Sequence, residues 1–90
     1  DASALAKAPK GDVNIASFAF MPAKIAAAAG RPIKFLNADD SPHWIVVPGA
    51  AQKTEVLLRG QTSAITFEKA GTYDYVCGLH PSMKGSIEVK

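Results

Sequence analysis

Apolar and polar residues alternate with a period of two along most of this 90-residue chain. Such alternation is typical of β-strands that bury one face, and turn signals about 8–12 residues apart are typical of sandwiches and barrels. Residues 24–30 are rich in alanine, but Pro22 and Pro32 bracket them closely and the segment is too short for a stable isolated helix. A short strand is therefore expected there, and the whole pattern predicts an all-β sandwich of seven to eight strands.

The beginning of this pattern is irregular. Val13 and Ile15 share one face of the first strand, whereas Phe18 and Phe20 have the opposite parity. The change predicts a bulge or bend near residues 16–17, as when a strand passes from one sheet to its neighbour. Farther along the chain, a strand is expected at residues 54–58, whose sequence is TEVLL.

Length and composition narrow the classes of protein. The chain suffices for one small domain, and we expect a loose arm at residues 1–10 followed by a single domain at residues 11–90. The net charge is only +2, the lysines are scattered and no aromatic ladder accompanies them, so nucleic-acid binding has little support. No apolar run approaches the roughly 18 residues that a membrane-spanning helix needs.

The softest metal donors of the chain lie together in the stretch YVCGLHPSMKG. Cys77, His80 and Met83 follow the pattern C-x2-H-x2-M, in which Cys77 ends a predicted strand and the rest is loop. The second histidine, His43, lies in SPHW at the start of another predicted strand. If the two strands are neighbours, His43 completes a set of two histidines and one cysteine, with Met83 as a weaker fourth ligand.

This donor set favours copper. Thiolate, thioether and imidazole together suit both oxidation states of copper, and a trigonal His2Cys set with a weak axial methionine is the blue-copper arrangement. A lone cysteine in a small exported protein is a liability unless something such as a metal occupies its thiolate. The sequence therefore predicts one copper ion.

Other interpretations remain open. A His2Cys set can hold zinc, although zinc has little use for a thioether. A Cys–His nucleophile needs an orienting group, an oxyanion hole and a cleft, for which a small sandwich offers no clear place, so no enzyme activity is expected. Asp39 and Asp40, just before His43, are expected to form a solvated acidic loop rather than part of a catalytic set or a Ca²⁺ loop.

At these residues the sequence resembles the cupredoxins, the small blue copper proteins. FAFMPAKIAAAAGRPIKFLNADDSPHWIVV follows the family's order of strand, proline, strand, glycine turn, strand, Asn-x-Asp loop and histidine. AGTYDYVCGLHPSMKG has the short ligand spacing of the amicyanin subfamily. The resemblance implies a Greek-key sandwich with type 1 copper at one end, and it implies that Tyr73 forms a tyrosine corner.

Several residues around the predicted ligands are also of interest. Cupredoxins usually have Asn directly after the first histidine ligand, and it bonds to a Ser or Thr after the cysteine, whereas this chain has Trp44 and Gly78. Because both polar partners are replaced together, neither is left unpaired, and we expect Trp44 to pack in their place. Leu79 stands where amicyanins have proline, and Asn37 ends the strand before the acidic loop; both are placed around the site.

The resemblance implies the shuttling of single electrons between larger redox proteins, such as an amine dehydrogenase and a c-type cytochrome. His80 is expected to be the electron port, with Leu79 and Pro81 as a small apolar docking patch around it. The protein is expected to be a monomer of the bacterial periplasm whose signal peptide has been removed. Copper storage or delivery in the same compartment is the alternative, because it uses the same ligands.

Overall fold

The computed structural model describes residues 11–50 and 52–90, so the arm expected at residues 1–10 lies outside the described residues. The described residues form nine short strands and one 3-10 turn, η1 (Pro48–Ala50), and include no α-helix. The strands are β1 (Val13–Ala16), β2 (Ala19–Met21), β3 (Lys24–Ala27), β4 (Pro32–Asn37), β5 (Ile45–Val47), β6 (Gln52–Lys53), β7 (Thr62–Thr66), β8 (Gly71–Cys77) and β9 (Lys84–Val89). None of the described segments is a helix long and apolar enough to span a membrane.

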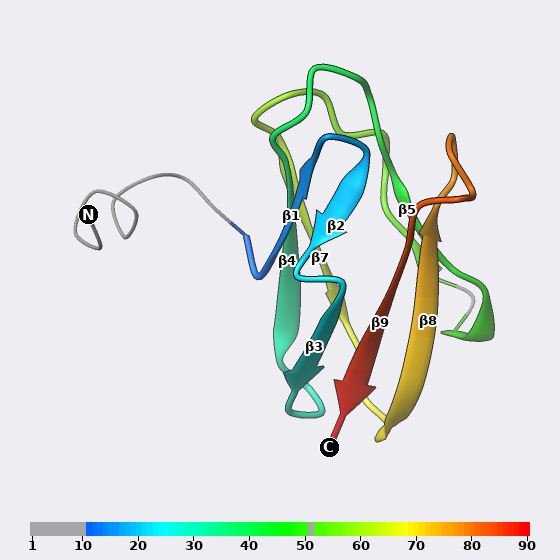
Figure 1. Cartoon of the computed structure of the whole chain (residues 1–90). Helices are drawn as coiled ribbons and strands as arrows, with labels where there is room; N and C mark the ends of the chain where they lie inside the picture. The colour runs from blue at the N-terminus through cyan, green and yellow to red at the C-terminus, as the bar shows by residue number, and fades with distance from the viewer. Residues whose placement is uncertain (1–10, 51) are drawn as a thin grey trace.

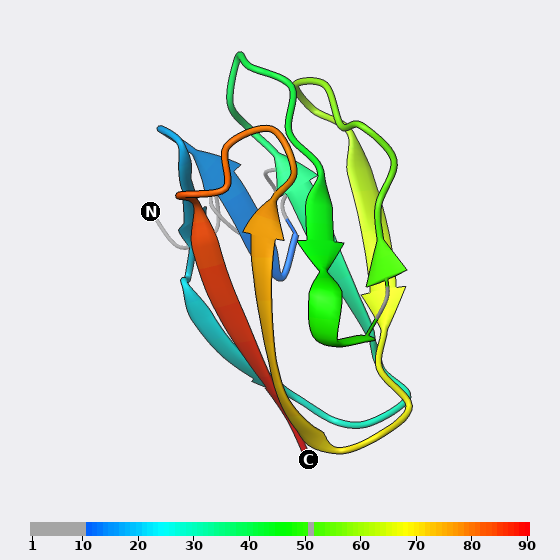
Figure 2. The same cartoon turned by 90° about the vertical axis from the view of Figure 1, so that its right-hand side faces the viewer.

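The strands form two sheets that pack face to face (Figures 1 and 2). One sheet has the order β2-β1-β4-β7 and the other has the order β3-β9-β8-β5-β6. The β1–β4 and β3–β9 pairs are parallel, so strands far apart in the sequence are neighbours. The prediction of an all-β sandwich is confirmed.

Alternate side chains from both sheets fill the space between the layers. Ile15 and Phe35 from one sheet and Ile45 and Tyr75 from the other have no exposed surface. The Tyr75 ring meets Phe35 edge to face, with centroids 5.4 Å apart. Burial of these apolar groups is the main force that holds the layers together, and it gives the loops at each end a rigid base.

The irregularity at the start of the chain is a hairpin rather than a change of sheet. β1 and β2 are antiparallel neighbours in one sheet, and Ala16 pairs with Ala19. The two residues between them, Ser17 and Phe18, have left-handed φ values of 51° and 58°. The predicted bend is therefore confirmed, but the predicted passage to the other sheet is wrong. Splitting this segment in two also raises the number of strands above the expected seven to eight.

The strand expected at residues 54–58 is largely absent. The Thr54 N–H still donates to the Ile45 carbonyl at 2.9 Å, but the Ile45 N–H donates at 3.0 Å to Thr54 Oγ1 instead of to a backbone carbonyl, so the regular ladder ends there. Pairing resumes only as an isolated bridge between His43 and Leu57. This bridge fixes the backbone of a predicted ligand against a neighbouring loop.

Two other expectations hold. The alanine-rich segment forms the short strand β3, which pairs with β9 along Lys24–Ala27. The Tyr73 hydroxyl donates to the Lys69 carbonyl at 2.8 Å, four residues upstream, as in a tyrosine corner. The Tyr73 ring also stacks on Phe67, with centroids 4.4 Å apart, so this corner braces the turn before β8.

Candidate metal centre

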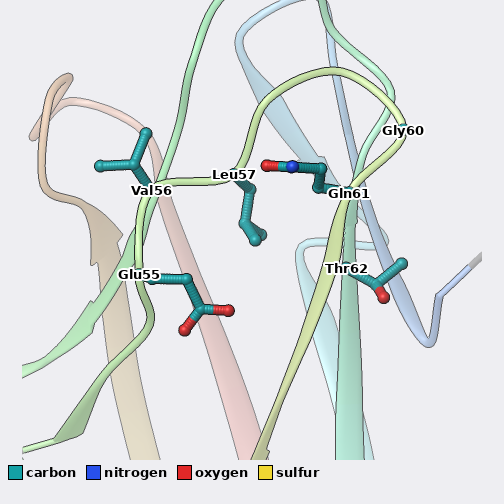
Figure 3. Close-up of a pocket in the computed structure, with 6 residues that line it drawn as sticks. All are labelled: Glu55, Val56, Leu57, Gly60, Gln61 and Thr62. Carbon is teal, nitrogen blue, oxygen red and sulfur yellow. The ribbon is translucent and has the colours of Figure 1, made fainter.

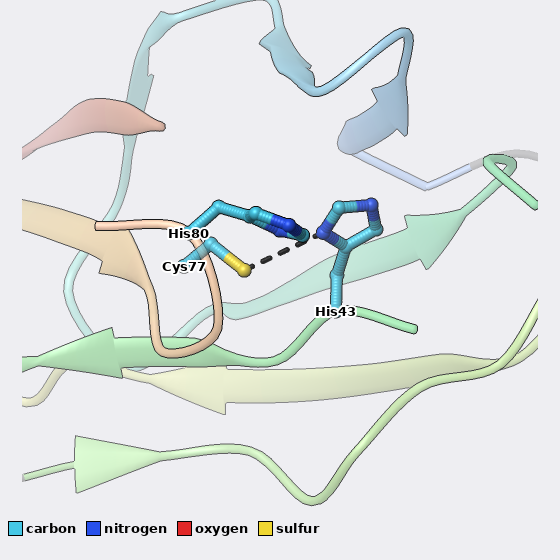
Figure 4. Close-up of side chains that lie close together, drawn as sticks. All are labelled: His43, Cys77 and His80. Atoms are coloured by element: carbon cyan, nitrogen blue, oxygen red, sulfur yellow. Dashed lines mark hydrogen bonds between the residues drawn. The ribbon is translucent and has the colours of Figure 1, made fainter. Parts of the chain in front are cut away.

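Loops at one end of the sandwich, the upper end in Figure 1, bring the predicted ligands together. His43 lies just before β5, Cys77 is the last residue of β8, and His80 lies in the loop between β8 and β9. One potential ligand atom from each of these residues lies within 4.8 Å of the others. Figure 4 shows the three side chains converging from two separate segments. The structure therefore brings together three of the four predicted ligands.

His43 is held by its backbone and by both ring nitrogens. Its N–H donates to the Leu57 carbonyl at 3.1 Å, and its carbonyl accepts the Leu57 N–H at 2.7 Å. Its side chain is fully buried, with Nε2 3.0 Å from Asp39 Oδ2 and Nδ1 3.4 Å from Cys77 Sγ. An ionised carboxylate can only accept a hydrogen bond, so Nε2 carries the proton and Nδ1 presents its lone pair to the thiol. That lone pair is available to a metal.

Asp39 belongs to the site, although the sequence pattern did not distinguish it from Asp40. The prediction of a solvated acidic loop is confirmed for Asp40, whose side chain is 83% exposed. It is wrong for Asp39, whose side chain is only 14% exposed. The hydrogen bond with His43 lowers the pKa of the Asp39 carboxyl below its ordinary value and outweighs the opposing effect of burial. Backbone N–H groups of Phe18 and Asp40 lower this pKa further. Asp39 therefore stays ionised and orients His43.

Asn37 builds this arrangement from inside the fold. Its side chain is fully buried, and its Oδ1 accepts the Asp39 N–H at 2.8 Å, which forms an Asx turn. Its Nδ2 donates to the Ser41 carbonyl at 2.9 Å and to the Leu57 carbonyl at 2.7 Å. Asn37 thus ties together the two segments that contact His43.

The loop between β8 and β9 closes on itself. The Cys77 N–H donates to the Met83 carbonyl at 3.1 Å, and the Met83 N–H donates to the His80 carbonyl at 2.9 Å. Cys77 is fully buried and Met83 is 5% exposed, but ligation by the Met83 sulfur stays a prediction. Nδ1 of His80 is buried and finds no hydrogen-bond partner among the described residues. Such a nitrogen is costly to bury unless another group binds it, as a metal would.

Trp44 and Gly78 fit against each other beside this loop. The Gly78 N–H donates to the Trp44 carbonyl at 2.9 Å. A Cβ atom at Gly78 would lie only 1.6 Å from Trp44 Nε1, so the half-buried indole covers this glycine. The indole thus packs against Gly78, as expected for the two positions at which cupredoxins have a polar pair.

A separate pocket lies under the loop that follows β6 (Figure 3). It measures about 440 Å³ and is lined by Glu55, Val56, Leu57, Gly60, Gln61 and Thr62. Its wall contains no histidine and no cysteine, so it does not share the metal donors. Leu57, in the wall of this pocket, pairs with His43 through its backbone.

Comparison with known proteins agrees with this architecture. A family model described as a cupredoxin-like domain matches residues 1–89. Amicyanin-alpha of Methylorubrum extorquens is 34% identical over 94 residues, covering 97% of this chain and 79% of that protein. Amicyanin of Paracoccus versutus is 31% identical over 83 residues, covering 87% of this chain and 63% of that protein. A solved structure of a reduced Cu(I) form of an amicyanin variant has a TM-score of 0.81 at 28% identity, covering 94% of this chain and 88% of that one. The chain belongs to the cupredoxin family.

The residues present fit the single copper ion that cupredoxins bind. His43, Cys77 and His80 offer the mixed nitrogen and thiolate set of a type 1 site, and Met83 follows on the same loop. Nδ1 of His80 is buried without a hydrogen-bond partner among the described residues, and the free Cys77 thiol is buried 3.4 Å from Nδ1 of His43, so a bound metal would give all three groups a common partner. Asp39 supplies the outer contact that orients ligating histidines in metal sites.

Replacing Asp39 by asparagine should weaken Cu(II) binding and raise the reduction potential. The amide keeps a hydrogen-bond acceptor beside His43 but removes the negative charge that favours Cu(II). Loss of such an outer contact typically costs about 10- to 100-fold in metal affinity. With Cu(I) affinity unchanged, each tenfold loss raises the potential by about 59 mV.

Asp40→Asn is the matched control, because it makes the same change of charge at the adjacent exposed residue. Cyclic voltammetry and competitive Cu(II) titration of both variants provide the comparison. Equal shifts in the two variants would mean that only overall charge matters, and the orienting role of Asp39 would be refuted.

Proposed function

We propose that this chain is a blue copper protein that shuttles single electrons between larger redox proteins, with His43, Cys77, His80 and Met83 as ligands. The observation that carries the proposal is the convergence, within 4.8 Å, of ligand atoms from two histidines and the chain's only cysteine at the end of a packed sandwich. When bound, copper supplies the one-electron chemistry by alternating between Cu(I) and Cu(II).

The chain's own residues contribute a fixed and largely dry surrounding for the metal. His43 and Cys77 are fully buried, and hydrogen bonds tie His43 to Asp39 and Cys77 to Met83. Because the ligands stand on a packed β-scaffold, little has to move when an electron arrives or leaves. We assign these residues to holding a metal, and we therefore propose a carrier rather than an enzyme.

His80 is the proposed electron port because it is the histidine that approaches the surface. It is half-buried, whereas His43 is fully buried. Leu79, which is 44% exposed, and Pro81, which is also exposed, flank it as the proposed docking patch. A small apolar surface around a ligand suits brief encounters.

The partners and the compartment are proposed from the resemblance to amicyanins. A donor such as an amine dehydrogenase and an acceptor such as a c-type cytochrome would meet this monomer in the bacterial periplasm. The amicyanin relatives of Methylorubrum extorquens and Paracoccus versutus support this class of carrier.

Electron self-exchange between copies of the protein tests the proposal. The copper-loaded protein should cycle between its two oxidation states without losing metal, and NMR line broadening in mixtures of the two should reveal rapid exchange. Leu79→Glu should slow this exchange by placing like charges in the docking patch. Met21→Glu, an equally charged change at a residue 51% exposed on β2, is the control and should not slow it.

The outcome also separates electron transfer from copper delivery. Slow self-exchange combined with ready loss of copper to a chelator would replace the shuttle by a delivery protein. Retention of zinc in preference to copper would refute both functions.

A further inference from the structure

The tip of the hairpin between β1 and β2 carries an unexpected residue. Ser17 and Phe18 both have left-handed φ values, 51° and 58°. Glycine, asparagine and aspartate are the residues that adopt this conformation readily, whereas a bulky side chain is disfavoured there. Phe18 is also 51% exposed, so core burial does not account for it either. Residues held in such a conformation often serve a site.

Phe18 contacts the candidate metal centre in three ways. Its ring meets His43 at a centroid distance of 5.7 Å and His80 at 5.1 Å, with interplanar angles of 78° and 84°. Its backbone N–H donates at 3.2 Å to Asp39 Oδ2, the oxygen that lies 3.0 Å from His43 Nε2. The hairpin belongs to one sheet, whereas Cys77 ends a strand of the other. Phe18 therefore closes the site across the sandwich.

We propose that Phe18 is a positioning residue that clamps both histidine rings in the orientation in which their nitrogens face Cys77. The proposal rests on the copper site proposed above. An edge-to-face aromatic contact restricts the rotation of both rings. His43 has a further restraint from Asp39, whereas Nδ1 of His80 has no partner among the described residues. His80 thus depends on Phe18 more than His43 does, and the strained turn is retained for the site rather than for the fold.

Two asparagine variants separate the clamp from ordinary packing. Phe18→Asn relieves the strained conformation and removes the ring, whereas Ser17→Asn relieves the adjacent residue and leaves the ring in place. We expect Ser17→Asn to raise the melting temperature of the metal-free protein, and Phe18→Asn to leave it nearly unchanged because relief of the strain offsets the lost ring contacts. Only Phe18→Asn should release Cu(I) faster to the chelator bathocuproine disulfonate, by about tenfold, which is the size of effect known for outer contacts of metal ligands.

Each alternative result has a definite meaning. If the two variants release Cu(I) at the same rate, Phe18 does not clamp the histidines and the proposal is refuted. If Phe18→Asn instead lowers the melting temperature of the metal-free protein, faster release reflects a loosened fold and the clamp is refuted. If the unmodified protein itself shows no thiolate-to-copper absorption, the proposed function has failed rather than the clamp.

Discussion

Replacing Cys77 by serine should remove nearly all of the intense visible absorption of the Cu(II)-loaded protein. That absorption arises from charge transfer between a thiolate and Cu(II), and Cys77 is the only cysteine in the chain. A serine hydroxyl does not ionise near neutral pH and is a poor ligand for copper, so it cannot replace the Cys77 thiolate. The visible spectra of both proteins, recorded at equal copper content, provide the measurement.

Val76→Ala is the control for this experiment, because Val76 precedes Cys77 on β8 and is not a potential ligand. This variant should keep the absorption band, and circular dichroism should show that both variants retain the sandwich. A band that survives in Cys77→Ser would falsify thiolate ligation, and the proposed redox function would fall with it.

Replacing Gly78 by alanine should destabilise the metal-free protein strongly. The new Cβ would lie 1.6 Å from Nε1 and 2.2 Å from Cε2 of the Trp44 indole, so the large half-buried ring has to move. Overpacking of this kind costs about 1–3 kcal/mol. For a domain of this size, that cost lowers the melting temperature by roughly 4–24 °C.

A double-mutant cycle tests the cause of this effect. Trp44→Ala removes the ring, so adding Gly78→Ala in that background should cost little further stability. If Gly78→Ala is equally costly with and without the indole, the steric contact is not responsible.

Much of the fold was predictable because burial of alternate residues leaves a direct trace in the sequence. Ile33 and Phe35 on β4, like Ile87 and Val89 on β9, alternate with polar residues and are buried. The hairpin between β1 and β2 was not recognised, because its turn lacks the glycine, asparagine or aspartate that signals left-handed residues. The sequence does show the change of parity before Phe18, but a strand that bends from one sheet into the other would show the same change.

The residues of the candidate site likewise divide into those that the sequence predicts and those that it does not. The spacing of Cys77, His80 and Met83 is local, and His43 is the only other histidine, so all could be named from the sequence. Asp39 was missed, because its neighbour Asp40 has the same chemistry and the Asx turn of Asn37 decides which carboxylate faces inward. The Asn-x-Asp pattern was a signal for that turn. Phe18 gave no signal, because its contacts depend on packing between the two sheets.

The spacing of the proposed ligands also affects how metal binding is coupled to folding. Three of them lie within residues 77–83, whereas His43 is 34 positions before Cys77. An unfolded chain therefore keeps most of its metal donors close together, and folding adds only His43. A ligand that also binds the unfolded state stabilises the folded state by less than its affinity for the completed site implies. In this protein, the thermodynamic link between copper and folding therefore depends chiefly on one imidazole.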